Sequence, residues 1–167
     1  MSAITAHGID VTLPAGWDGL ITVRNNGAPT TAFSASGVAV APLRSHPVVH
    51  LANFGLPAER GDFGSGAVEL MGDRDVFVVL FEYEADSAGT ALFRSRGLPT
   101  SLAPRDFSPA TLRRGIVGQS AHQAFFHDGG RAFCLYVVLG SHARRAALVP
   151  LVNRVLTTVR ITPRTAG

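Results

Sequence analysis

Two ten-residue segments of this chain are apolar on both of their alternating faces, and they limit the possible folds more than any other feature. Segments 75–84 (DVFVVLFEYE) and 131–140 (RAFCLYVVLG) carry apolar side chains at odd and at even positions. Successive side chains of a strand point to opposite faces of a sheet, so both faces of these strands must be shielded from water. The two segments therefore predict a sheet with a packed layer on each side.

Shorter segments around these two strands complete the sheet. The further predicted strands lie at 9–13, 19–24, 47–54 and 119–126, and we expect the first two to pair as a hairpin that opens the fold. We expect the strand at 119–126 to form a hairpin with the following strand through a two-residue turn at Asp128 and Gly129. Residues 25–31 read as a loop, and residues 32–45 show no clear period.

Two helices are predicted in the second half of the chain. Ser108 and Pro109 make a good helix start, because serine caps free amide groups and proline fits the first turn, and we expect this short helix to end near Gly115. Apolar residues at helical spacing across 141–160 predict a longer amphipathic helix. We place its start near Ala147, with Pro150 in the first turn, since a proline in the helix interior would cost about 3 kcal/mol.

Composition fits one globular domain over residues 1–167, because 46% of the residues are hydrophobic and only 16% are charged. No apolar run approaches the roughly 18 residues of a membrane-spanning helix. The N-terminus lacks the pattern of a secretory signal. The single cysteine, Cys134, excludes an intramolecular disulfide and fits a reducing compartment. We therefore expect a cytoplasmic protein without membrane insertion.

Charge is divided unevenly along the chain. Residues 1–86 hold ten acidic residues and four arginines (net −6), whereas residues 87–167 hold two acidic residues and eleven arginines (net +9). Such asymmetry marks either a basic face for nucleic acid or an acidic partner, or two halves that neutralise each other when they pack together. We favour mutual neutralisation, because the arginines are scattered or paired and are not interleaved with aromatic residues.

The sequence shows no pattern typical of catalysis, cofactor binding or metal binding. It contains no lysine, which excludes a Schiff-base or P-loop lysine. The glycine-rich run 61–66 (GDFGSG) lacks the Walker lysine, and no histidine lies in an HExxH pattern. Cys134 is interpreted as a small buried hydrophobic residue, because the predicted hairpin turns His122 to the opposite face of the sheet. We expect no cofactor and no metal.

Two groups of side chains are the candidates for a functional surface. The first consists of two arginine pairs that would bind a partner protein: Arg113, Arg114, Arg144 and Arg145. The second would line a pocket between the sheet and the helix: Glu82, Tyr136 and His122. Glu82 ends a predicted central strand, where a carboxyl group beside apolar residues can serve as a general acid or can pair with an arginine.

The opening segment GIDVTLPAGW resembles the PsbP-like superfamily, in which a strand ends in a Leu/Tyr-Pro-x-x-Trp signature. The residues that carry the resemblance are Ile9, Val11, Leu13, Pro14, Gly16 and Trp17. The late apolar hairpin and the final amphipathic helix fit the same plan. The resemblance implies an α/β/α sandwich around a central, mainly antiparallel β-sheet with a C-terminal amphipathic helix. It also implies a domain that acts by docking onto other proteins, as the superfamily's photosynthetic accessory proteins and a nuclear-import factor do.

From these observations we expect an α+β chain that serves as a non-catalytic accessory or adaptor domain and acts by protein-protein interaction. The alternative is a small-molecule-binding protein, or a weak enzyme, with a pocket between sheet and helix. Nucleic-acid binding is the least favoured reading, since it needs the arginines to form one basic face. The partner's identity and the oligomeric state stay open at this point.

Overall fold

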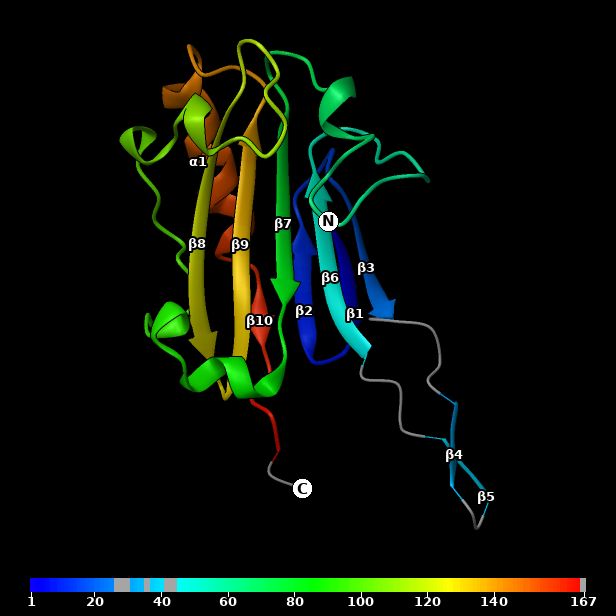
Figure 1. Cartoon of the computed structure of the whole chain (residues 1–167). Helices are drawn as coiled ribbons and strands as arrows, with labels where there is room; N and C mark the ends of the chain where they lie inside the picture. Colours follow the sequence, from blue (N-terminus) through cyan, green and yellow to red (C-terminus); the bar gives the residue numbers. More distant parts are fainter. Residues whose placement is uncertain (26–30, 35–36, 41–44, 166–167) are drawn as a thin grey trace.

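A central antiparallel sheet of five strands organises the protein, whose computed structural model describes residues 1–25, 31–34, 37–40 and 45–165 (Figure 1). The strand order is β3-β6-β7-β9-β8. The strands are β3 (Asp18–Asn25), β6 (Ser45–Ala52), β7 (Val76–Glu82), β9 (Arg131–Leu139) and β8 (Ser120–Asp128). Between β3 and β6, strands β4 (Thr31–Ser34) and β5 (Gly37–Val40) pair with each other. The loop predicted at 25–31 falls mostly outside the described residues.

Strands β7 and β9 are the two segments that were predicted to be covered on both faces. They pair with each other at the centre of the sheet, with Val79 opposite Tyr136, and every residue of both strands is buried. One face carries Val78 and Leu80, and the other carries Phe77 and Val79. The prediction of a layer on each side is confirmed.

The first layer consists of helix α1 (Arg145–Leu156) and a small sheet, which Figure 1 shows on the same side of the central sheet. The small sheet has the order β1-β2-β10, with β1 (Ser2–Ala6), β2 (Ile9–Leu13) and β10 (Arg160–Ile161). The predicted opening hairpin is wrong, because β2 pairs with β1 and β10 while β3 pairs with β6 in the central sheet. Val152 and Val155 of α1 share one hydrophobic cluster with Val11 of β2 and Leu80 of β7. The apolar face that was predicted for this helix is the face that packs against these strands.

Helix α1 begins earlier than predicted. It starts at Arg145, where Leu148 donates its N–H to the Arg144 carbonyl oxygen at 3.1 Å, so Pro150 lies inside the helix and not in its first turn. A proline at that position leaves the carbonyl group of Ala146 without its helical partner. Ala146 and Pro150 are both exposed, so water can take the place of the missing N–H donor.

The opposite layer contains loops and short 3₁₀ turns in place of a second helical layer. Its apolar contacts come from segments 54–71 and 112–116, which pack against the face that carries Phe81 and Tyr136. Only one α-helix occurs in the part of the chain that the structure describes. The α/β/α sandwich is thus present in part, as a mainly antiparallel sheet with a C-terminal helix on one side.

The short helix predicted from Ser108 begins as expected and ends early. Ser108 Oγ accepts the Ala110 N–H at 3.1 Å, but only the 3₁₀ turn η5 (Pro109–Thr111) forms. The amide of Arg113 donates to the hydroxyl oxygen of Tyr136 at 2.9 Å. A tertiary hydrogen bond thus takes the N–H that would have continued the helix.

The β8–β9 hairpin turns at Gly129 and Gly130, so the register differs by two residues from the predicted one. Asp128 lies opposite Arg131, and both glycines have positive φ, which two-residue hairpin turns favour. A shift of two residues keeps every side chain on its predicted face. His122 therefore points away from Cys134, as predicted.

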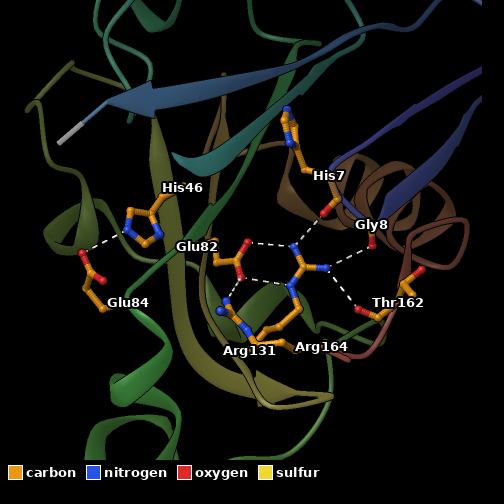
Figure 2. Close-up of polar contacts among 8 residues, drawn as sticks. All are labelled: His7, Gly8, His46, Glu82, Glu84, Arg131, Thr162 and Arg164. Carbon is orange, nitrogen blue, oxygen red and sulfur yellow. Dashed lines mark hydrogen bonds and ion pairs between the residues drawn. The ribbon is translucent and has the colours of Figure 1, made fainter. Parts of the chain in front are cut away.

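A buried ion pair connects the small sheet and the C-terminal segment to the central sheet (Figure 2). Arg131 donates to the two carboxylate oxygens of Glu82 at 2.9 and 2.7 Å. It also donates to the carbonyl oxygens of His7 at 2.9 Å and of Gly8 and Thr162 at 3.1 Å each. All five N–H groups of this guanidinium have partners, so its burial leaves no donor unsatisfied.

Glycine at position 8 is required by this arrangement. Gly8 has a φ of +73°, and a Cβ atom there would lie 2.9 Å from the Nη1 atom of Arg131. The turn between β1 and β2 can therefore approach the guanidinium only without a side chain.

The uneven charge of the sequence is neutralised across the fold. Four ion pairs join acidic residues of the first half to arginines of the second. The pairs are Glu69 with Arg114, Asp73 with Arg144, and Glu82 with both Arg131 and Arg164. Mutual neutralisation, the interpretation favoured from the sequence, is confirmed for these residues.

Replacing Arg131 by Met should lower the free energy of unfolding by about 3–5 kcal/mol, because the Glu82 carboxylate then stays buried with only the half-exposed Arg164 beside it. Chemical denaturation at pH 7 measures this loss. Adding Glu82→Leu should recover much of it by removing the stranded charge. The exposed Arg154→Met is the control, with an expected change within about 0.5 kcal/mol. A double variant as unstable as the single one would contradict this account of the ion pair.

Candidate functional site

A surface cavity of about 210 Å³ opens on the face of the central sheet opposite α1. Tyr136 and Val138 of β9 form its floor. Phe63 and Ser65, from the glycine-rich segment, form one wall. The opposite wall comes from residues 112–114, after η5, and from the buried Gln119. Three segments that are distant in sequence thus meet over one central strand.

The phenol of Tyr136 sits at the base of the cavity with 2% of its surface exposed. Its oxygen accepts the main-chain N–H of Arg113 at 2.9 Å, which fixes the position of the neighbouring wall. Burial raises the pKa of the Tyr136 hydroxyl above its ordinary value of 10.0. The group is therefore uncharged at neutral pH.

The side chain of Arg113 lies across the cavity wall with its charge uncompensated. Its guanidinium carbon is 3.7 Å from the ring centroid of Phe63 and 5.6 Å from that of Tyr136. It forms no ion pair with a carboxylate among the residues described, whereas its neighbour Arg114 pairs with Glu69 at 2.9 Å. Two arginines and one carboxylate leave one net positive charge at the rim.

Gln119 contributes an unsatisfied hydrogen-bond acceptor. Its side chain is 3% exposed, and its Nε2 donates to the Val68 carbonyl oxygen at 2.8 Å. Its Oε1 is buried and has no partner within the described part of the chain. A buried acceptor without a donor costs about 1–3 kcal/mol, and the burial of this atom also keeps it out of reach of a group that enters the cavity.

The glycine-rich run forms a tight turn that presents Phe63. Gly64 has a φ of +93°, and a Cβ atom there would collide with the ring of Phe77. The N–H groups of Gly61 and Gly66 donate to the Ser65 carbonyl oxygen and the Glu69 carboxylate, at 2.8 and 2.7 Å. These amides are engaged within the protein, so the run serves as a scaffold and not as a phosphate cradle.

A buried histidine holds this turn against the sheet. Arg60 donates its Nε–H to His50 Nδ1 at 2.7 Å, so the Nε2 atom of the neutral ring carries the proton and donates to the Asp62 carbonyl oxygen at 2.8 Å. Burial lowers the pKa of His50 below its ordinary value of 6.5, and the charge of Arg60 adds to this effect while the Asp62 bond opposes it.

The predicted arginines divide into two places. Arg113 and Arg114 lie at the cavity, whereas Arg144 pairs with Asp73 at 2.9 Å and Arg145 donates to the His142 carbonyl oxygen at 2.9 Å. Arg145 borders a second, more open hollow, which adjoins the cavity because both are lined by Leu112 and Gln119.

The three residues predicted to share a pocket do not meet. Tyr136 lies in the cavity, whereas Glu82 and His122 lie on the face of the sheet that carries α1. Glu82 is occupied by Arg131, and His122 Nδ1 lies 3.1 Å from the Asp106 carbonyl oxygen. Strand alternation sends residues of one sheet to opposite faces, so nearness in the sheet does not make them neighbours.

Several cavity residues were missed at the level of sequence, Phe63 and Gln119 among them. Phe63 lies in the glycine-rich run 61–66, which was rejected as a phosphate-binding loop because it lacks the Walker lysine. An aromatic residue between glycines could still have indicated a side chain that a tight turn holds at the surface. No sequence pattern pointed to Gln119, because the lack of a hydrogen-bond partner for its Oε1 atom within the described residues is a result of tertiary packing.

Cys134 is buried beside the cavity floor, and burial raises the pKa of its thiol above 9.0. Gln123 Nε2 lies 3.4 Å from its sulfur. The interpretation as a small buried hydrophobic residue is confirmed.

No cluster of three or more metal-ligating side chains occurs in the described ranges. No helix there is long and apolar enough to cross a membrane.

Comparison of the chain with family models, curated proteins and solved structures finds no match.

Acid should destabilise the turn that presents Phe63. In the native state the depressed pKa of His50 keeps the ring neutral, while the unfolded chain takes up a proton as the pH falls below 6.5. The stability that His50 contributes is thus present above pH 6.5 and is lost as the pH falls through the lower, native-state pKa. Urea denaturation of wild type and His50→Gln between pH 8 and about pH 5 should show a stability difference that shrinks with acid. A difference that is constant over this range would contradict the assignment.

Proposed function

We propose that the chain is a non-catalytic adaptor domain that binds another protein, and that the cavity beside Arg113 is the docking site. The observation that carries this proposal is the exposed guanidinium of Arg113, which lies 3.7 Å from the ring centroid of Phe63 at the cavity and has no carboxylate partner among the described residues. The cavity itself, with about 210 Å³, has room for one large side chain. Protein interfaces concentrate their binding energy in such anchor pockets.

The arrangement of Arg113 supports docking of a protein. Its guanidinium is already stacked on Phe63, so little side-chain freedom is lost when a partner binds. Arginine and aromatic residues are enriched at protein interfaces, and the unpaired charge favours a partner with an acidic residue at this point.

A small-molecule ligand is the second candidate, and the observation that favours it is the adjoining hollow of about 740 Å³, which shares Leu112 and Gln119 with the cavity and has the volume of a typical ligand pocket. Nucleic-acid binding is disfavoured, because Arg114, Arg131, Arg144 and Arg164 are engaged with carboxylates and do not add to one basic face.

Membership of the PsbP-like superfamily remains part of this proposal. Strand β2 ends at Leu13, and Trp17 donates its N–H to the Pro14 carbonyl oxygen at 3.1 Å, closing the turn after the signature. The antiparallel sheet and C-terminal helix α1 agree with that plan. We also propose a cytoplasmic location, which the single buried thiol of Cys134 fits.

Arg113→Gln should weaken capture of a partner from the native organism's lysate by about tenfold or more, because it removes the unpaired charge at the rim. Arg154→Gln, an exposed arginine on α1, is the matched control and should capture the partner as wild type does. Quantitative mass spectrometry of the eluates compares the three proteins, with and without nuclease. Equal capture by Arg113→Gln, or bound material that nuclease removes, would contradict the proposed docking site.

A further inference from the structure

We infer that two copies of the chain associate through the free edge of β3, with the two β3 strands antiparallel and Ile21 opposite Ile21 at the two-fold axis. This inference goes beyond the proposed function, because it concerns a different part of the molecule from the cavity beside Arg113. It rests on the different covering of the two sheet edges, on main-chain groups of β3 that point outward, and on the match of β3 with its own reversed sequence.

The two edges of the central sheet, β8 and β3, differ in how they are covered (Figure 1). Loop residues bond to the outer side of β8 near both of its ends. Ser108 exchanges two main-chain hydrogen bonds with Ala121, at 2.9 and 3.0 Å, and His127 bonds to Ser95 and Gly97 at 2.8 and 2.9 Å. Among the described residues, only β6 forms main-chain hydrogen bonds with β3. An open edge of this kind is a template for a further strand.

The main-chain groups of Ile21 and Val23 point toward this open edge. Asn53 donates its N–H to the Val76 carbonyl oxygen at 3.3 Å, so odd-numbered residues of β6 bond to β7 and even-numbered residues bond to β3. In the β3–β6 register, even residues lie opposite even residues. The odd-numbered residues of β3 therefore direct their N–H and C=O groups away from β6.

The middle of β3 lacks the features that usually protect an edge strand. Segment 19–23 (GLITV) contains no charged residue, no proline and no bulge. Leu20 and Val23 are 46% and 37% exposed, and they lie on opposite faces of the strand. A single strand laid along the edge would shield both side chains.

A second copy of the chain is the partner that closes the assembly. Pairing of β3 with β3 of another copy joins two sheets of five strands into one sheet of ten and places β8 at both ends. Both ends of the combined sheet are then edges that loop residues already cover. Growth therefore stops at a two-fold dimer.

The register centred on Ile21 lets the outward-pointing groups meet. Two hydrogen bonds form between the two Ile21 residues, because outward-pointing residues then lie opposite each other. Each Val23 lies opposite Gly19 of the other copy and donates its N–H to the Gly19 carbonyl oxygen. The N–H of Gly19 keeps its bond to Asp18 Oδ1 at 2.9 Å. Four main-chain hydrogen bonds, two at the centre and one at each end, thus join the copies without disturbing Asp18.

Charges at the two ends of β3 favour this antiparallel pair. Asp18 lies opposite Arg24 of the other copy at each end, whereas a parallel pair in register would place like charges together. The Arg24 guanidinium lies 4.0 Å from the ring centroid of Phe81, and its ion pair with Asp62 is long, at 3.9 Å. Rotation of this side chain toward the edge brings it to the exposed Asp18 carboxylate of the other copy.

The test is sedimentation equilibrium of the full chain from about 1 to 100 μM, where we expect monomer and dimer in equilibrium. Val23→Pro removes an outward N–H, which an edge strand tolerates, and should weaken the dimer at least about tenfold. Val23→Thr keeps this N–H, so it is the matched control and should dimerise as the wild type does. Circular dichroism and thermal unfolding confirm that each variant is folded.

Charge reversal tests the register. Asp18→Arg alone and Arg24→Asp alone each place like charges opposite each other at both ends, and each should weaken its homodimer about five- to thirtyfold. A mixture of the two variants restores opposite charges in the mixed dimer, which should recover most of the lost affinity. These variants keep every main-chain N–H of β3, so they decide the question if Val23→Pro does not fold.

Three results would overturn the inference: a monomer over the whole concentration range, a dimer that Val23→Pro leaves intact, or a mixture no more dimeric than the separate variants. Species larger than a dimer would show that the combined sheet is not closed at its β8 edges. Arg113→Gln should dimerise as the wild type does, which separates this result from the proposed docking site.

Discussion

The guanidinium of Arg131 holds together parts of the chain that are far apart in sequence. It joins the end of β7, through Glu82, to the turn between β1 and β2 and to the segment that follows β10. Among the described residues, the remaining contacts between the small sheet and the central sheet are apolar, and such contacts by themselves set no unique position; the C-terminal segment is held in addition by Arg164, which contacts Glu82 and the Gly129 carbonyl oxygen. A buried ion pair adds little net stability, but a fully hydrogen-bonded one penalises every other arrangement of these segments. The position of the small sheet therefore depends on one strand-end arginine whose five donors are all used, whereas α1 is placed by its apolar contacts and by the hydrogen bonds between Asn153 and Leu102.

The two faces of the central sheet have different tasks. One face is covered by α1 and the small sheet, and Glu82, a candidate functional residue from the sequence, is engaged there in the ion pair with Arg131. On the other face the covering layer has no regular helix, and loops leave a cavity over Tyr136. Irregular segments can bring glycines, an aromatic ring and main-chain donors to one point more easily than a helix can, because their side chains need not follow a fixed period. The proposed docking site lies where the regular structure ends.

Much of the fold could be predicted from local pattern. The double-sided strands β7 and β9, the hairpin that joins β8 to β9 and the amphipathic face of α1 follow from periods of two and 3.6 residues. Errors arose where a tertiary contact overrode a local preference. The turn after Ser108 ends early because Tyr136 takes the Arg113 amide, and the helical layer expected opposite α1 is replaced by loops. Of the candidate site, Arg113, Arg114 and Tyr136 were named from the sequence, while Phe63 and Gln119 were not.

The sequence by itself determined the strands, their buried faces and the presence of charges of opposite sign in its two halves, because these depend on the order of residue types along the chain. Only the tertiary structure decided which charges would meet and which would be left over. Arg113 and Arg114 are adjacent and chemically identical, yet Arg114 is paired with Glu69, whereas Arg113 lies on Phe63 without a carboxylate partner among the described residues. Pairing is a matter of distance between segments that are separated by some forty or more residues in the chain, and no local pattern encodes such a distance.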